Sequence, residues 1–359
     1  MKSYGEYAKT KDYFLKAIPG ADQYAGAKSY VFADGPARGL RGIDVHTGTG
    51  FSFTVIPDRG MDIAYTSYKG IPIAFLTKNG LKSPANCPPL PDAEFNRYFM
   101  AGLVTTCGPD NAGFACTING KSYPMHGSNT MMAADDVAIE KTIDGCDITI
   151  TVKGTLRYSE LFSQNIVIQR SILAKSGESK VILEDKIMNE GGVPFGYMMM
   201  YHCNFGFPIV STDSYIATNH KEMNYLFDPP AGVSGLDTTI EAPRADYEGI
   251  VFDLHEADGN VGRAGIFNRV LDLGAYVESN VDELKEYTLW MNYGIQDYVI
   301  GLEPGTNNPI GRENATREGR LTELLPGETH TKTLTIGVVE GEKEFTSLGF
   351  GDTLSASSL

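Results

Sequence analysis

The chain has 359 residues, 42% of them hydrophobic, which is enough to bury a substantial core in one large domain or two smaller ones. Its 45 acidic and 30 basic residues give a formal net charge of −15. Such a surface repels phosphate backbones and anionic lipid headgroups, so neither nucleic acid nor a membrane is expected as a partner.

The start of the chain has no recognisable targeting signal. MKSYGEYAKTKDYFLKAI lacks the apolar core of a signal peptide, and no run of about 18 or more apolar residues occurs anywhere. We therefore expect a cytoplasmic protein. The cysteines are five in number and form no CxxC pair. Disulfides and a zinc cage are thus not expected, and the thiols are interpreted as small buried hydrophobic groups.

Period-two segments and turn residues dominate the chain after one helix, which is predicted over Tyr7–Ile18. The absence of strand–helix alternation argues against a nucleotide-binding α/β fold and predicts an all-β fold. We expect an N-terminal segment over 1–19, a single β domain over 20–345 and a C-terminal tail over 346–359. The strands are expected at GFSFTVIPDRG (50–60), CDITITVKGTLRY (146–158), NIVIQRSILAK (165–175), KVILEDKIMN (180–189), YVIGLEP (298–304) and HTKTLTIGVVE (330–340).

The segment MMMYHCNFGF (198–207) carries a histidine and an amide at the end of an apolar run. In a strand, one face is uniformly apolar and meets the core. The other face begins with methionines and ends with His202 and Asn204. A sheet face that becomes polar where it meets a ligand has this pattern. A buried histidine bonded to a backbone carbonyl is the ordinary alternative.

A second strand, YVIGLEPGTNNPIG, places Glu303 on the same face as Gly301. Burying a carboxylate in an apolar strand is costly unless the group is paired or used. Gly301 removes side-chain bulk beside the carboxylate and leaves room for another group to approach. A salt bridge to a Lys or Arg elsewhere in the chain is the alternative role for Glu303.

Two further candidates lie in loops or at strand ends, where binding residues concentrate on β scaffolds. His126 stands between Pro124 and Gly127 in GKSYPMHGSN, and Arg59 follows Pro57 in VIPDRGMDI. Arg is a rigid donor of several hydrogen bonds and can bind hydroxyl oxygens. A solvent-exposed histidine and an ordinary Asp–Arg turn are the alternatives.

Taken together, these segments resemble the aldose 1-epimerase (galactose mutarotase-like) family, in particular its branch of uncharacterised bacterial aldose-epimerase-like proteins. The resemblance extends from about Gly20 to Glu340. The matching segments, in family order, are FTVIPDRGMDI, GLVTTCGPDNAG, YPMHG, YHCNFGFP, FDLHEADG, LWMNYGIQDYVIGLEP and LLPGETH. It implies a β-supersandwich of large antiparallel sheets with few short helices.

The resemblance also implies a reaction, the interconversion of the α and β anomers of an aldose by ring opening and closure. Glu303 would be the base that takes the proton of the anomeric hydroxyl, and His202 the acid that protonates the ring oxygen. Neither a metal nor an organic cofactor is required, and the partner is a small sugar. The oligomeric state is not predicted.

The same resemblance assigns substrate binding to Arg59, His126, Asn204 and Asp253. Asp253 lies in the expected region of the motif FDLHEADG, although His255 and Asp258 are rivals for its role. The family sequence around the catalytic histidine is not reproduced, because Cys203 and Asn204 replace the usual pair. Aromatic residues such as Trp290 or Tyr298 could stack on a sugar, although core packing is their commoner role.

Two other functions remain open at this stage. A metal-dependent sugar isomerase could use His126, His202 and Glu303 as ligands of a divalent ion, but no HxH or HxxxE spacing supports this. A non-catalytic carbohydrate-binding module could share the fold. Such a module would not need both an acid-type histidine and a base-type glutamate.

Overall fold

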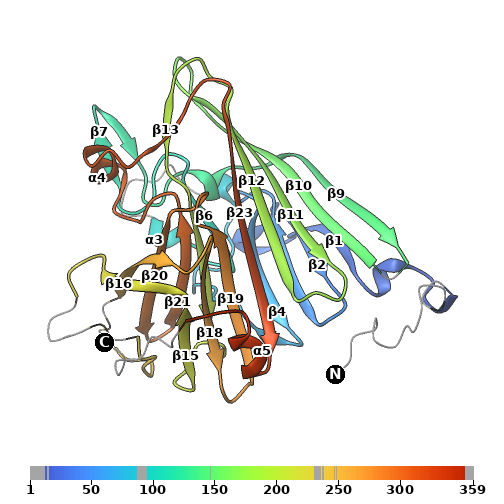
Figure 1. Cartoon of the computed structure of the whole chain (residues 1–359). Helices are drawn as coiled ribbons and strands as arrows, with labels where there is room; N and C mark the ends of the chain where they lie inside the picture. The colour runs from blue at the N-terminus through green and yellow to red at the C-terminus, as the bar shows by residue number, and fades with distance from the viewer. Residues whose placement is uncertain are drawn as a thin grey trace.

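The protein, analysed as a computed structural model, is described for Tyr13 and residues 16–86, 95–145, 147–229, 236, 238–245, 247 and 249–351. The helix predicted over Tyr7–Ile18 lies almost wholly outside these residues. The predicted all-β class is confirmed, because antiparallel sheets make up most of the described chain (Figure 1). No helix of this part of the chain is long and apolar enough to cross a membrane.

Three sheets form the body of the molecule. The five-stranded sheet contains β1 (Gly26–Val31), β2 (Arg41–His46), β3 (Phe51–Ile56), β4 (Asp62–Tyr68) and β5 (Ile71–Pro72). The eight-stranded sheet has the order β15 (Ser214–Thr218), β18 (Val261–Asn268), β19 (Leu273–Asn280), β23 (Thr329–Glu340), β12 (Lys180–Asn189), β11 (Asn165–Lys175), β10 (Asp147–Ser159) and β9 (Asp135–Asp144). The six-stranded sheet has the order β16 (His220–Tyr225), β17 (Ile250–Ala257), β20 (Glu286–Gly294), β21 (Asp297–Gly305), β14 (Met200–Gly206) and β6 (Thr105–Cys107).

Smaller elements connect these sheets. Two short two-stranded sheets occur: β13 (Phe195–Tyr197) pairs with the distant β22 (Thr322–Leu324), and β7 (Cys116–Ile118) forms a hairpin with β8 (Lys121–Tyr123). The family resemblance implied a few short helices without placing them, and in the described residues they include α3 (Phe95–Tyr98), α4 (Arg312–Arg317) and α5 (Glu342–Thr346). The 3₁₀ turns are η1 (Ala21–Gln23), η2 (Gly35–Ala37), η3 (Pro84–Asn86) and η5 (Asn129–Met131).

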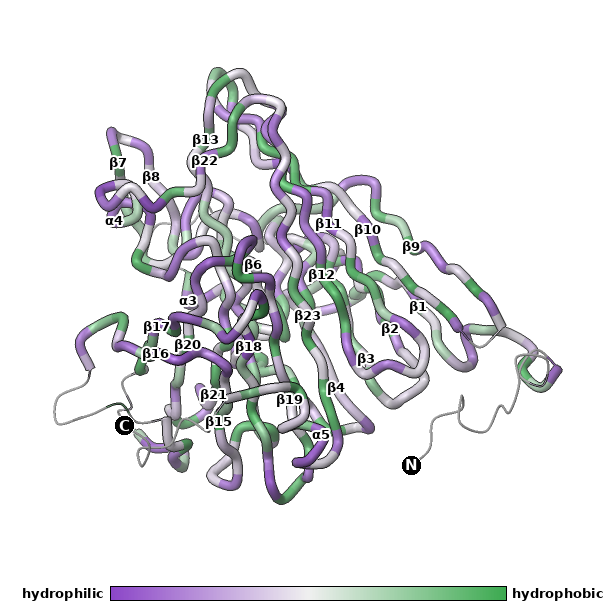
Figure 2. The backbone as a smooth tube through the Cα atoms, in the orientation of Figure 1, coloured by the Kyte–Doolittle hydropathy of each residue, from purple (hydrophilic) through white to green (hydrophobic). Residues whose placement is uncertain are grey.

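Alternating hydropathy explains why the predicted segments form strands. Along β10 the burial alternates from Ile148 to Leu156, so one face packs on the core and the other is open to solvent. Figure 2 shows hydrophobic and hydrophilic residues following one another along β10, β11 and β12. Residues 346–351, the described part of the predicted tail, are not detached from the body, because Phe350 stacks on Phe345.

Main-chain bridges join the five-stranded sheet to the six-stranded sheet. Ala74 pairs with Phe205, and Leu76 pairs with Ala101. The amide of Phe75 also donates a hydrogen bond to the carbonyl of Asn204 at 3.0 Å. This continuity supports our proposal that residues 20–345 form one domain.

A buried ion network holds all three sheets together. Arg170 on β11 donates to both carboxylate oxygens of Asp185 on β12, at 2.8 and 2.6 Å. Its Nη1 donates to the carbonyl of Gly60 and lies 3.3 Å from Asp62 at the start of β4. The hydroxyl of Tyr201 on β14 donates to Asp185 at 2.7 Å. The charged side chains are fully buried, so each depends on the others for solvation.

We predict that Arg170→Met lowers the free energy of unfolding by about 3–5 kcal/mol, because it leaves two carboxylates buried without their cation. Chemical denaturation measures the change. Arg157→Met is the matched control, because the Arg157–Glu190 pair is about half exposed and such pairs contribute about 1 kcal/mol or less. Equal stability of Arg170→Met and the parent protein would contradict the structural role of the network.

Candidate active site

One cross-strand row on the six-stranded sheet collects polar residues that are far apart in the sequence. In the β14–β21 register Met200 opposes Gly305 and Cys203 opposes Leu302, which sets His202 opposite Glu303. Directly opposed residues of antiparallel strands project on the same face. Continued across the sheet, the row reads Thr105, His202, Glu303, Thr288, Asp253 and Asn224.

The strand containing His202 has the two faces predicted from its sequence. Met199, Tyr201, Cys203 and Phe205 belong to the main hydrophobic core. On the opposite face, His202 and Asn204 are polar but buried. The prediction that this face turns polar toward a ligand site is consistent with the pocket described next.

A cavity of about 250 Å³ opens over His202 and Glu303. The histidine ring is held by neighbouring rings, with centroid distances of 5.3 Å to Phe99, 5.3 Å to Trp290 and 5.6 Å to His126. The aromatic lining comprises Phe95, Phe99, Phe114, Phe227 and Trp290. Aromatic walls beside a few polar groups are the usual composition of a small-molecule site.

His202 and Glu303 face each other at the bottom of this cavity. The Nδ1 of His202 lies 3.1 Å from the Oε1 of Glu303. Neither atom has a hydrogen-bond partner of acceptable geometry within the described residues. Glu303 also forms no ion pair with a Lys or Arg in this part of the chain, which removes the alternative role considered for it.

Burial controls the protonation of this pair. It raises the pKa of Glu303 well above the ordinary value of 4.5. Burial, together with the nearby His126, lowers the pKa of His202 well below 6.5, and the Asn204 side chain offsets part of this effect. Burial therefore favours the neutral form of each group, in which the pair carries one transferable proton shared between two coupled groups.

Gly301 provides the space for the carboxylate, as the sequence predicted. A methyl group at Gly301 would lie 2.2 Å from the Oε1 of Glu303 and 3.3 Å from the Cβ of Trp290. The glycine is therefore required by the position of Glu303 rather than by backbone conformation.

His126 is held in the wall of the same cavity. Its φ of +58° is unusual for a residue other than glycine, and its backbone amide donates to the carbonyl of Gly113 at 2.9 Å. The amide of Gly113 donates in return to Nδ1 of the ring at 3.3 Å. Burial lowers the pKa of His126 to about 4, so the ring is neutral at pH 7 with its proton on Nε2. This nitrogen is a hydrogen-bond donor at the pocket wall.

Asn204 supports His202 from two residues along the strand. Its Nδ2 donates to the carbonyls of His202 at 2.7 Å and Gly102 at 3.1 Å. Its Oδ1 is buried and has no partner within the described residues. Asn204 is not part of the cavity lining and is 0% exposed.

The structure corrects the expected position of Arg59. The side chain is buried and does not line the cavity. Its Nη1 donates to the carbonyl of Lys82 at 3.0 Å, and its Nη2 to the carbonyl of Tyr98 at 3.1 Å. A buried guanidinium must satisfy its donors locally, and here it binds main-chain oxygens. Arg59 therefore anchors the end of α3 instead of binding a ligand. Phe95 of the same helix lines the cavity.

Asp253 lies in the polar row but outside the cavity lining. Its Oδ2 accepts a hydrogen bond from Nδ2 of Asn308 at 2.8 Å and lies 3.5 Å from Nε2 of His255. Its Oδ1 is buried without a partner within the described residues. The rival Asp258 is exposed and lies near Lys221.

The sequence analysis missed most of the aromatic wall. Phe95, Phe99, Phe114 and Phe227 come from loops and a short helix without periodic patterns, so only the structure brings them together. Trp290 lines the cavity, whereas Tyr298 packs in the core and its hydroxyl donates to the carbonyl of Glu241 at 2.7 Å. The period-two pattern of β20 would have placed Thr288 and Trp290 on one face.

The fold is shared with solved structures of several bacterial proteins. A Klebsiella pneumoniae protein provisionally named as an aldose 1-epimerase superposes with a TM-score of 0.82 at 20% identity, over 93% of this chain and 91% of that one. A galactose mutarotase-like protein from Clostridium acetobutylicum gives 0.63 at 17% identity, over 89% and 99%. The galactose 1-epimerase of Lactobacillus acidophilus gives 0.57 at 15% identity, over 89% and 100%. The predicted galactose mutarotase-like fold is thus confirmed.

Sequence comparison gives a family but no activity. No curated protein matches the chain significantly. A family model described as a domain of unknown function, DUF4432, matches residues 37–338, which is most of the chain. The chain therefore belongs to the DUF4432 family.

Proposed function

We propose that the protein is an aldose 1-epimerase-like isomerase that interconverts the α and β anomers of a free aldose. The observation that carries this proposal is the His202–Glu303 pair, which lies buried and unpartnered at the bottom of an aromatic cavity. A polar pair without hydrogen bonds is costly in the free protein, and a polyhydroxylated ligand would satisfy it.

The reaction needs one base and one acid on the same sugar. Glu303 in its ionised form takes the proton of the anomeric hydroxyl while His202 donates a proton to the ring oxygen. The C1–O5 bond then breaks and leaves an open-chain aldehyde. Rotation about C1–C2 followed by the reverse proton transfers closes the ring on the other face.

The shared proton fits this requirement. Burial favours the two neutral forms, but a sugar hydroxyl donating to Glu303 and a ring oxygen accepting from His202 would both favour the ion pair. The two atoms are 3.1 Å apart, and a small rotation of either side chain on sugar binding would align them for this proton to pass. Each proton transfer is expected to contribute roughly 10²- to 10⁴-fold to the rate.

The surrounding residues support a neutral sugar as the substrate. The described cavity lining contains no Lys or Arg. A phosphate would be placed beside Glu303 without a cation, which is unfavourable. Nε2 of His126 would donate to a sugar hydroxyl, and Trp290 would pack on the sugar ring.

The metal-dependent isomerase has weaker support. His126, His202 and Glu303 do not form a group with converging ligand atoms, whereas Asp253, His255 and Glu286 do so within the described residues. A non-catalytic binding module remains the alternative, and the next experiment separates it from the enzyme.

Glu303→Gln and His202→Asn are each predicted to lower the anomer-exchange rate by roughly 10²-fold or more, with a much smaller change in sugar affinity. Exchange is followed by NMR over a panel of free sugars and sugar phosphates, after subtraction of the spontaneous rate. Glu278→Gln is the matched control, since Glu278 pairs with Arg263 in the eight-stranded sheet. If Glu303→Gln exchanges anomers as fast as the parent protein, the binding module becomes the better proposal.

The pH dependence is predicted from the same pair. The active form carries one proton on the pair, so activity falls when His202 gains a second proton or when Glu303 loses the last one. Because burial lowers the pKa of His202 and raises that of Glu303, the acid limb of kcat/KM should lie below pH 6.5 and the alkaline limb well above pH 4.5. A profile measured in non-coordinating buffers tests this. An acid limb centred above pH 7 would contradict the assignment.

A further inference from the structure

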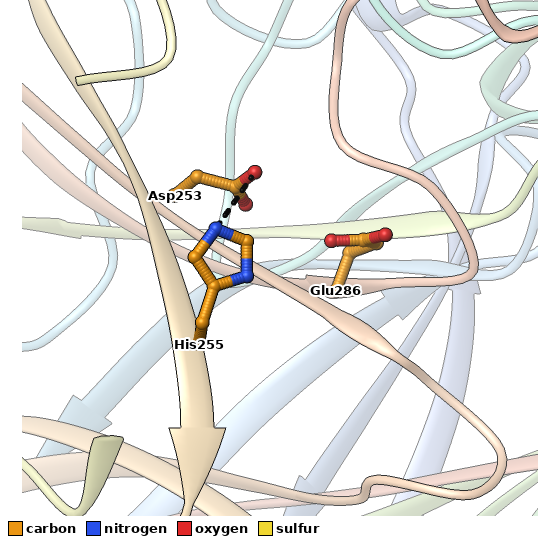
Figure 3. Close-up of side chains that lie close together, drawn as sticks. All are labelled: Asp253, His255 and Glu286. Carbon is orange, nitrogen blue, oxygen red and sulfur yellow. Dashed lines mark ion pairs between the residues drawn. The ribbon is translucent and has the colours of Figure 1, made fainter. Parts of the chain in front are cut away.

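A second cluster of side chains lies on the same sheet, outside the cavity. Asp253 and His255 project from one face of β17, two residues apart. In the β17–β20 register Leu254 opposes Tyr287, which sets His255 opposite Glu286. Figure 3 shows the three side chains converging, with the His255 ring between the two carboxylates. One ligand atom from each lies within 4.8 Å of the others.

One carboxylate oxygen of Asp253 accepts no hydrogen bond from the described residues. The residue is 7% exposed, and its Oδ1 is buried with no hydrogen-bond partner in the described chain. The other oxygen already accepts from Asn308 and contacts His255. A buried carboxylate oxygen without a donor is unfavourable, and a cation would satisfy it.

The cluster has an excess of negative charge. Two carboxylates, those of Asp253 and Glu286, lie beside a single imidazole. The neighbouring cation, Arg320, lies 3.9 Å from Glu286, but its Nη2 is closer to Glu318, at 2.8 Å. Arg320 therefore neutralises the cluster only in part. His255 and Glu286 remain partly exposed, with 38% and 22% of their side chains accessible, so an ion could enter.

We propose that Asp253, His255 and Glu286 bind one divalent transition-metal ion, such as Mn²⁺ or Zn²⁺. One imidazole nitrogen and two carboxylates form a mixed N/O set that suits such ions, whereas Ca²⁺ and Mg²⁺ prefer oxygen ligands alone. The ion would take no part in the proton transfers proposed for Glu303 and His202.

The ion would instead fix the loop beside the cavity. Asp253 accepts from Asn308, and the next residue, Pro309, lines the cavity wall. A ligand that holds Asp253 would thus also hold Asn308 in place. This inference is independent of the proposed isomerase activity, because ion binding is measured without any sugar.

The test uses the full chain without an affinity tag, treated with a chelator and desalted. Mn²⁺ binding is followed by the loss of the free-ion EPR signal, and Zn²⁺ binding by competition with a chromophoric chelator. One ion per chain is expected, and His255→Gln and Glu286→Gln should each weaken binding by roughly 10-fold or more, by analogy with losses caused by changes around metal sites. The same ion concentration should raise the Tm of the parent protein more than that of His255→Gln, because the weaker site is less occupied.

His330→Gln is the matched control. His330 and Glu328 form another half-exposed pair, at 3.0 Å, and this change should leave ion binding unaltered. The proposal is overturned if the parent protein binds no ion saturably up to millimolar concentration, or if His255→Gln binds as tightly as the parent. Binding of Ca²⁺ as tightly as Mn²⁺ would also overturn it, because it would exclude His255 as a ligand.

Discussion

The position of the site depends on one buried arginine. Arg170 lies where the three sheets meet, bound to Asp185 in the eight-stranded sheet and to Asp62 at the edge of the five-stranded sheet. Tyr201, which donates to the same Asp185, immediately precedes His202 on β14. The network therefore fixes the position of β14 along its own axis relative to the hydrophobic core behind it. A shift of β14 by one residue would turn His202 into the core and Tyr201 into the cavity.

Strand register, rather than sequence proximity, assembles the polar row. Thr105, His202, Glu303, Thr288 and Asp253 meet because five strands in the order β6, β14, β21, β20 and β17 align them. Strand patterns predicted that His202 and Glu303 each lie on a strand face with unusual polarity, and the family resemblance predicted that the two act on one sugar; the strand register that brings them together is what the structure adds. The face of each strand can be predicted from period-two patterns, but the neighbour of each strand cannot, because pairing is non-local.

The same difference between local patterns and non-local strand pairing explains which features the sequence could predict. Regular features such as the β10, β11 and β12 strands, the two faces of β14 and the space left by Gly301 were predicted, because they depend on local alternation. Arg59 was assigned to substrate from its position after a strand, but its donors bind carbonyls from residues 82 and 98 that no pattern connects to it. The pairing of His255 with Glu286 likewise depends on the register of β17 and β20, which sequence patterns do not predict.

The packing of the aromatic wall determines the environment of the His202–Glu303 pair. Phe99 and Trp290 pack around the His202 ring, and the burial of the pair shifts both of its pKa values toward the neutral forms. A solvated pair would separate its charges and bind water, and it would gain little from a sugar. At the bottom of the cavity, Nδ1 of His202 and Oε1 of Glu303 have no hydrogen-bond partner among the described residues, and the hydroxyls of a bound polyol would supply one. The packed sheets behind β14 and β21 keep the two groups in place.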